Sequence, residues 1–193
     1  MALHTTSPFT YDDFVTFPDD GQRYELIDGE VYVTPAPNTR HQDVVLRLAV
    51  LLYQHVERHG GGRVYVAPTD VVLSTTNVVE PDVLFLTDAE IAKITRPNIQ
   101  GAPRLAIEVL SDPRHDRVRK RRLYARFGVP EYWIVDPDSE RVEVHRLACV
   151  AGTPCAEGDD YPSPTIVEPG SILTTELLPG LEIDVGALLA EGL

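Results

Sequence analysis

The fold of this 193-residue chain is decided by the stretch Gly101–Pro137, which reads GAPRLAIEVLSDPRHDRVRKRRLYARFGVPEYWIVDP. It begins with the run Arg104–Leu110, which is apolar after its first residue except at Glu108. Such a run is typical of a strand buried on both faces. A basic helix is predicted over about Arg117–Phe127, and a second apolar strand follows over Glu131–Val135. The order strand, helix, strand indicates helices packed on a sheet.

The predicted helix carries Lys120, one of the two lysines of the chain, on the face that should point inward. At 100° per residue, Lys120 falls on the same stripe as Leu123, Tyr124 and Phe127. A buried ammonium group needs a negative partner or a chemical role, because its desolvation is costly. The candidate partners lie upstream in the chain.

Two acids occur in apolar strands, where an ionised carboxylate is expensive to bury. Glu108 is one, and Asp82 begins the apolar run Asp82–Leu86 after Pro81. Taken alone, each has a simpler interpretation, as a turn carboxylate or an ion-paired strand residue. If the two strands are neighbours, however, the carboxylates converge and the following helix brings Lys120 over them. Two carboxylates and an ammonium around a hard divalent cation can bind a phosphate, activate a water and stabilise the developing charge.

The rest of the sequence predicts a mixed α/β arrangement in a single domain spanning residues 1–193. A hairpin is predicted over about residues 23–34, because Asp28-Gly29 is a strong turn signal. An irregular surface excursion rich in Gly, Pro and acidic residues is predicted over about residues 148–170. The other predicted helices are Tyr11–Phe17, Thr39–His59 and Asp88–Ile94. Extended runs are predicted at Arg63–Ala67, Thr69–Leu73, Asp82–Leu86 and Val142–Leu147, and a short strand with a helical turn at Leu181–Leu189.

Composition limits the partners of the chain. The formal net charge of −13 argues against wholesale nucleic-acid binding, yet residues 114–126 hold seven of the 17 lysines and arginines. This basic cluster is either a solvated helix face or a local phosphate-binding patch, for which the candidates are Arg114, Arg117 and Arg121. No apolar run long enough for a membrane span and no signal peptide is found, so we expect a cytoplasmic protein without a membrane partner. Cys149 and Cys155 are expected to be free thiols.

Pro81-Asp82, Glu108 in an apolar strand and a following lysine resemble the PD-(D/E)xK nuclease signature. There is one departure, because the usual lysine position, two residues after the acid, holds Leu110. The same migrated lysine occurs in the restriction-endonuclease-like Uma family, and the resemblance covers most of the chain. The matching stretches are YELIDGEVY at Tyr24–Tyr32, RHQDVVLRLAVLL at Arg40–Leu52, EPDVLFL at Glu80–Leu86, the whole of Gly101–Pro137, and LLPGLEIDV at Leu177–Val185.

The resemblance implies a restriction-endonuclease-like α/β core: a helix, a three-stranded meander, a helix and further strands, in a mixed sheet flanked by helices. It also implies a Mg2+-dependent endonuclease, with Mn2+ as a substitute, that hydrolyses phosphodiester bonds in DNA. Asp82, Glu108 and the backbone carbonyl of Val109 would hold the metal. Lys120 would position or activate the attacking water and offset charge on the phosphate.

Weaker candidates for the same site are His41, Glu25 and Glu30, whose simpler interpretations are a core histidine and exposed hairpin acids. Asp116 is expected to be an N-cap or an i, i+4 partner of Lys120. The rival to the nuclease hypothesis is a catalytically inert nuclease-like module that binds nucleic acid or a protein partner. Because double-strand cleavage needs two active sites, we expect a homodimer, with the hairpin and the aromatic residues Tyr132 and Trp133 as candidate interface pieces.

Overall fold

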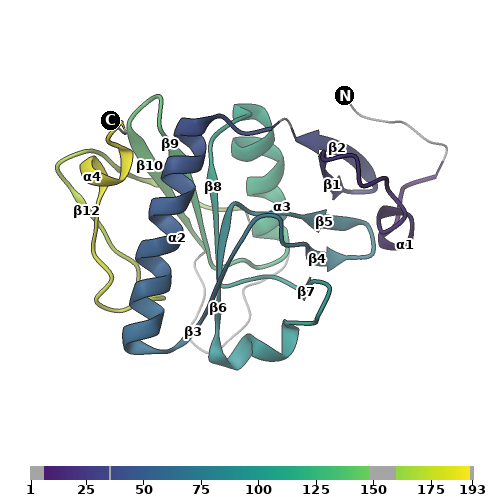
Figure 1. Cartoon of the computed structure of the whole chain (residues 1–193), viewed down its shortest axis with the longest axis horizontal. Helices are drawn as coiled ribbons and strands as arrows, with labels where there is room; N and C mark the ends of the chain where they lie inside the picture. The colour runs from purple at the N-terminus through teal and green to yellow at the C-terminus, as the bar shows by residue number, and fades with distance from the viewer. Residues whose placement is uncertain (1–6, 35, 148–159, 192–193) are drawn as a thin grey trace.

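The computed structural model describes residues 7–34, 36–147 and 160–191 (Figure 1). Cys149 and Cys155, for which free thiols were predicted, lie outside the described residues. Within them, no helix is both long enough and apolar enough to cross a membrane.

The larger of the two main sheets has six strands in the order β11-β10-β9-β8-β6-β3. Its central pair, β8 and β9, is parallel and its other neighbouring pairs are antiparallel, so the predicted mixed sheet is confirmed. The strands are β3 (Gly62–Val66), β6 (Val83–Thr87), β8 (Leu105–Val109), β9 (Glu131–Asp136), β10 (Arg141–Arg146) and β11 (Thr165–Val167).

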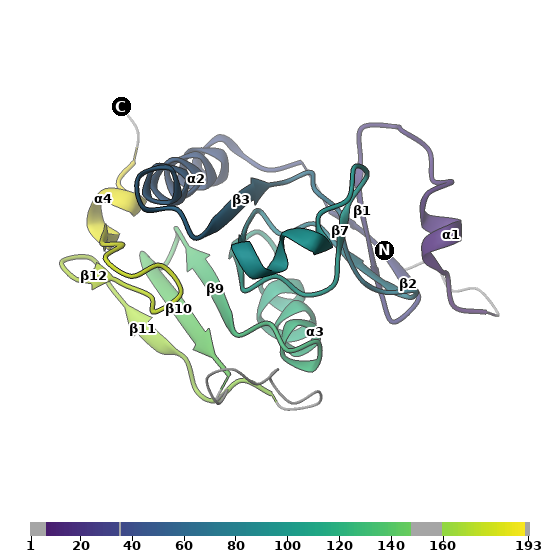
Figure 2. The ribbon, with the colours of Figure 1, turned by 90° about the horizontal axis from the view of Figure 1, so that it is seen from below.

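Helices cover both faces of this sheet, as Figure 2 shows for α2 and α3. The long helix α2 (Thr39–His59) has the predicted bounds and packs through Val44 and Leu48 against one set of alternate strand residues. Successive strand residues point to opposite faces of a sheet. Ile107 of β8 packs on the α2 face, so the next residue, Glu108, points to the opposite face and contacts Lys120 of the other helix. Tyr132 and Trp133 are fully buried in the two cores, so the prediction of these rings at a dimer interface is wrong.

The second helical layer is a continuous helix made of the π-helical turn η2 (His115–Lys120) and α3 (Arg121–Arg126). It begins earlier than the sequence predicts. The carboxylate of Asp112 accepts hydrogen bonds from the backbone N–H groups of Arg114, at 2.9 Å, and His115, at 3.3 Å. The prediction of Asp116 as the N-cap is therefore wrong, because that residue already lies in the first turn and is buried.

The three-stranded meander of the core consists of β3, β6 and β8, which pair antiparallel in that order. The chain between β3 and β6 leaves this sheet. The predicted run Thr69–Leu73 instead contributes β4 (Val71–Ser74), which pairs with β5 (Asn77–Val79), a strand that was not predicted.

These two strands complete a smaller sheet of order β2-β1-β5-β4-β7. The predicted hairpin supplies β1 (Arg23–Ile27) and β2 (Glu30–Thr34), and β5 joins β1 where Leu26 pairs with Val78. The short strand β7 (Ile99–Gln100) runs parallel to β4. Figure 1 shows the smaller sheet to one side of the larger one, and its hairpin contacts the basic helix through Glu25 and Lys120.

The remaining elements are short. The predicted irregular excursion contains one regular piece among its described residues, the edge strand β11. Arg47 Nη1 of α2 donates to the carbonyl of Leu188, at 3.0 Å, and so ties the C-terminal segment to α2. The short elements are α1 (Tyr11–Phe14), η1 (Asp88–Lys93), β12 (Ile172–Leu173), β13 (Ile183–Asp184) and α4 (Val185–Leu189).

A buried histidine on β10 predicts how stability depends on pH. His145 is 3% exposed between the rings of Tyr132 and Tyr161, and both ring nitrogens lack hydrogen-bond partners among the described residues. Burial lowers the pKa of His145 to about 4, whereas an unfolded histidine titrates near 6.5. Protonation therefore favours the unfolded chain, and we expect a stability loss on the order of 2 kcal/mol as pH falls from about 6.5 to about 4.

His145→Phe should flatten this acid-side loss, which urea unfolding at a series of pH values would measure. His59→Phe is the matched control, because His59 lies exposed at the end of α2. Equal pH slopes for wild type and His145→Phe would show that His145 does not carry the effect.

Candidate active site

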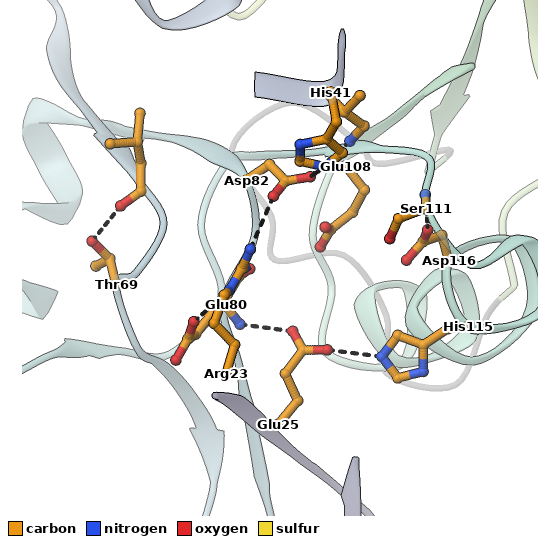
Figure 3. Close-up of polar contacts among 12 residues, drawn as sticks. Arg23, Glu25, His41, Thr69, Glu80, Asp82, Glu108, Ser111, His115 and Asp116 are labelled. Carbon is orange, nitrogen blue, oxygen red and sulfur yellow. Dashed lines mark hydrogen bonds and ion pairs between the residues drawn. The ribbon is translucent and has the colours of Figure 1, made fainter. Parts of the chain in front are cut away.

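The two predicted carboxylates meet because their strands are neighbours. β6 and β8 pair antiparallel with Val83 opposite Ile107, so Asp82 just before β6 and Glu108 on β8 come together one step further along. Asp82 is 4% exposed and Glu108 is 3% exposed. Both line a pocket of about 530 Å3, and Figure 3 shows their carboxylates facing it.

Lys120 reaches this pair from the helix behind the sheet, as its position on the apolar stripe predicts. Its Nζ lies 3.0 Å from Glu108 Oε1 and 2.9 Å from Glu25 Oε1, and the residue is 3% exposed. Burial by itself would lower the pKa of Lys120, but attraction to Glu108 and Glu25 outweighs burial and raises it. The ammonium is therefore firmly protonated between two carboxylates.

Glu108 is held on one side only. Its Oε1 accepts hydrogen bonds from Lys120 Nζ, at 3.0 Å, and from Tyr124 Oη, at 2.9 Å. Burial raises the pKa of Glu108 well above the ordinary value, and the negative charges of Asp82 and Asp116 add to this against the opposing effect of Lys120. Its surroundings thus disfavour the charged form of Glu108, and Lys120 is the group that opposes this.

Asp82 is oriented by three donors. Its Oδ2 accepts from the backbone N–H of Val109, at 2.9 Å, and lies 3.1 Å from His41 Nε2, while its Oδ1 lies 3.5 Å from Arg23 Nη1. Burial raises the pKa of Asp82, but His41, Lys120 and the Val109 N–H outweigh it, so the pKa is lowered. His41 is therefore a partner of the site rather than a packing residue of the core.

Glu25 belongs to the site more fully than the sequence indicates. It comes from β1 of the smaller sheet and is 1% exposed, so the alternative of an exposed hairpin acid is wrong for this residue. Its carboxylate contacts Lys120, lies 2.7 Å from His115 Nε2 and accepts from the Glu80 N–H at 2.9 Å. Burial would raise the pKa of Glu25, but Lys120 and His115 lower it to about 2.

Glu30 lies at the mouth of the same pocket and accepts a hydrogen bond from Tyr32 Oη at 2.7 Å. Residues that sequence reasoning did not assign to the site also contact it. Arg23 links Glu80, at 2.9 Å, to Asp82. His115 holds Glu25. The weak signals for these residues were a histidine inside the basic stretch and an arginine just before the YELIDGEVY match.

Of the three predicted phosphate-binding arginines, Arg117 and Arg121 are held in ion pairs and Arg114 is exposed. Arg117 Nη2 pairs with Asp136, at 2.6 Å, and with Glu143, at 2.9 Å. Arg121 pairs with Asp160 at 2.7 Å, and Arg114 is exposed. The arginines that line the pocket are Arg23 and Arg119, and neither was among the predicted phosphate-binding residues.

Comparison with known families agrees with this geometry. A family model described as "Uma2: Putative restriction endonuclease" matches residues 11–186. The chain belongs to the Uma2 family. None of the curated proteins searched matches this Uma2 chain.

A solved structure shares the fold of this Uma2 chain. It is described as a "putative nuclease belonging to DUF820" from Anabaena variabilis ATCC 29413, with 18% sequence identity and a TM-score of 0.76. The similarity covers 95% of this chain and 100% of the other. The predicted restriction-endonuclease-like fold is confirmed.

The residues of the pocket fit a hard divalent cation. Among the described residues, no group of three or more His, Cys, Asp or Glu side chains already surrounds a common point as metal ligands do. Mg2+ does not require such a group, because it usually keeps several waters and takes one or two carboxylates plus phosphate oxygens. Asp82 and Glu108 offer two carboxylates in one pocket.

Proposed function

We propose that this protein is a metal-dependent endonuclease that hydrolyses phosphodiester bonds in DNA. The observation that carries the proposal is the meeting of Asp82, Glu108 and Lys120 in one pocket, although they come from two strands and a helix. The description of the Uma2 family supports the same reaction class.

Asp82, Glu108 and the backbone carbonyl of Val109 would hold Mg2+, for which Mn2+ could substitute. When bound, the metal would supply Lewis-acid stabilisation of the phosphate and lower the pKa of a water. The chain prepares this site in advance, because His41 and the Val109 N–H fix the carboxylate of Asp82.

Lys120 supplies the positive charge that a phosphodiester needs at the site. Its ammonium lies beside Glu108 and is the natural group to orient a water and offset charge on the scissile phosphate. Glu25 holds Lys120 from the opposite side, and Tyr124 holds Glu108. Each reacting group thus has a second residue that fixes its position.

Metal titration tests the proposal. We expect the wild-type protein to bind Mn2+ in calorimetry and to nick a supercoiled plasmid with Mg2+ or Mn2+, because Asp82 and Glu108 offer two carboxylates in one pocket. Excess EDTA should stop cleavage, and added Mg2+ should restore it. Failure to bind Mn2+ at millimolar concentration would support the inert nuclease-like module instead.

We also propose that two copies act together on duplex DNA, since a two-fold dimer places its two sites on antiparallel strands. With Tyr132 and Trp133 buried, the remaining candidate surface from the sequence is the hairpin, where Val33 is 36% exposed. Sedimentation equilibrium at tens of micromolar protein should give the mass of a dimer. A monomer both with and without a DNA duplex would contradict this proposal.

A further inference from the structure

A second groove, of about 430 Å3, lies between the N-terminal hairpin and the outer face of the basic helix. One wall is the β1–β2 hairpin with Asp28, Glu30 and Tyr32. The other wall carries three exposed arginines, Arg119, Arg122 and Arg126. The guanidinium group of an exposed arginine typically donates hydrogen bonds to phosphate oxygens.

The three arginines form one stripe. Positions 119, 122 and 126 are spaced i, i+3, i+7, so their side chains lie on one helix face, away from buried Lys120 and Tyr124. Seven residues of helix span about 10 Å at 1.5 Å per residue. An exposed row of guanidinium groups of this length can contact successive phosphates of one DNA strand.

The groove adjoins the candidate active-site pocket. Both cavities are lined by Glu30, Tyr32 and Arg119, so these side chains form their shared boundary. The Arg119 guanidinium lies 5.1 Å from the centroid of the Tyr32 ring, and the same ring lies 5.1 Å from that of His115. A strand whose scissile phosphate sits at Glu108 would pass over Tyr32 and Arg119 to reach the groove.

We propose that this groove binds the phosphates of the DNA strand next to the cleavage site, through Arg119, Arg122 and Arg126. The inference rests on the proposed nuclease function. It assigns phosphate binding to these three arginines instead of Arg117 and Arg121, whose side chains pair with Asp136, Glu143 and Asp160. Arg126 pairs with Asp28, but those side chains are 44% and 60% exposed. An ion pair this exposed contributes little and is readily exchanged for a phosphate.

The test is equilibrium binding without cleavage. Fluorescence anisotropy would follow a fluorescein-labelled duplex of about 20 base pairs in EDTA, over roughly 50 to 200 mM salt. The variant is Arg119→Gln/Arg122→Gln/Arg126→Gln. Its matched control, Arg58→Gln/Arg63→Gln/Arg96→Gln, removes the same charge from exposed positions that line neither cavity.

We expect the groove variant to bind at least about tenfold more weakly at low salt, and the slope of log K against log salt to fall by about 2 to 3, at roughly 0.9 per phosphate contact. The control should keep the wild-type slope. An equal loss of DNA affinity in both variants would overturn the assignment of the groove as the phosphate-binding site. Metal-dependent cleavage by the wild type would in that case still support the nuclease proposal. A wild type that neither binds nor cleaves DNA would remove both proposals.

Discussion

Glu108→Gln should reduce metal-dependent DNA cleavage by on the order of 1,000-fold or more, because it removes a charged oxygen ligand from the proposed metal site. Asp82→Asn should act similarly. The fold should survive, since glutamine has the same shape and relieves carboxylate crowding around one buried lysine. A plasmid nicking time course and thermal melts would measure both effects.

The control for this experiment is Glu182→Gln, which alters an exposed acid far along the chain and should cleave like the wild type. If Glu108→Gln and Asp82→Asn also cleave like the wild type, a contaminating nuclease becomes the simplest source of the activity. The assignment of the pocket would then fail, whatever the family.

Lys120→Met should damage both chemistry and stability. Loss of one electrostatic donor of this kind typically costs about 100-fold or more in rate. The methionine also leaves Glu25 and Glu108 buried without their shared cation, and breaking a buried pair by removing one partner costs about 3 to 5 kcal/mol. Urea unfolding and the nicking assay would report the two losses separately.

The other lysine of the chain provides the matched control. Lys93 pairs with Glu90 at 2.8 Å with its side chain 33% exposed, so Lys93→Met should cost at most about 1 kcal/mol and leave cleavage intact. Adding Glu25→Gln to Lys120→Met should recover part of the stability but none of the activity. Recovery of cleavage in that double variant would show that Lys120 only neutralises Glu25.

Local patterns were sufficient to predict the frame of this fold. The bounds of α2 follow from its periodicity and from the Gly60–Gly62 stop, and the inward position of Lys120 follows from its helical stripe. The convergence of Asp82 and Glu108 required only that β6 and β8 be neighbours. These features depend on residues close in sequence or on one strand pairing.

What the sequence could not reveal depends on distant side-chain partners. Glu25 lies 95 positions before Lys120, and nothing in a hairpin acid signals burial against a remote helix. The short run that forms β4 reads the same whether it joins the larger or the smaller sheet. Likewise, the pairing of Arg117 with Asp136 and Glu143 depends on the packing of that helix beside β9 and β10.

The contact of Glu25 with Lys120 makes the chemistry a property of the assembled molecule. The carboxylates of Asp82 and Glu108 belong to the larger sheet, whereas the group that holds the lysine in place belongs to the smaller one. A proteolytic nick or local opening that released the hairpin should abolish the proposed cleavage while the six-stranded sheet stayed folded. Under the proposed function, cleavage would therefore require a docked hairpin.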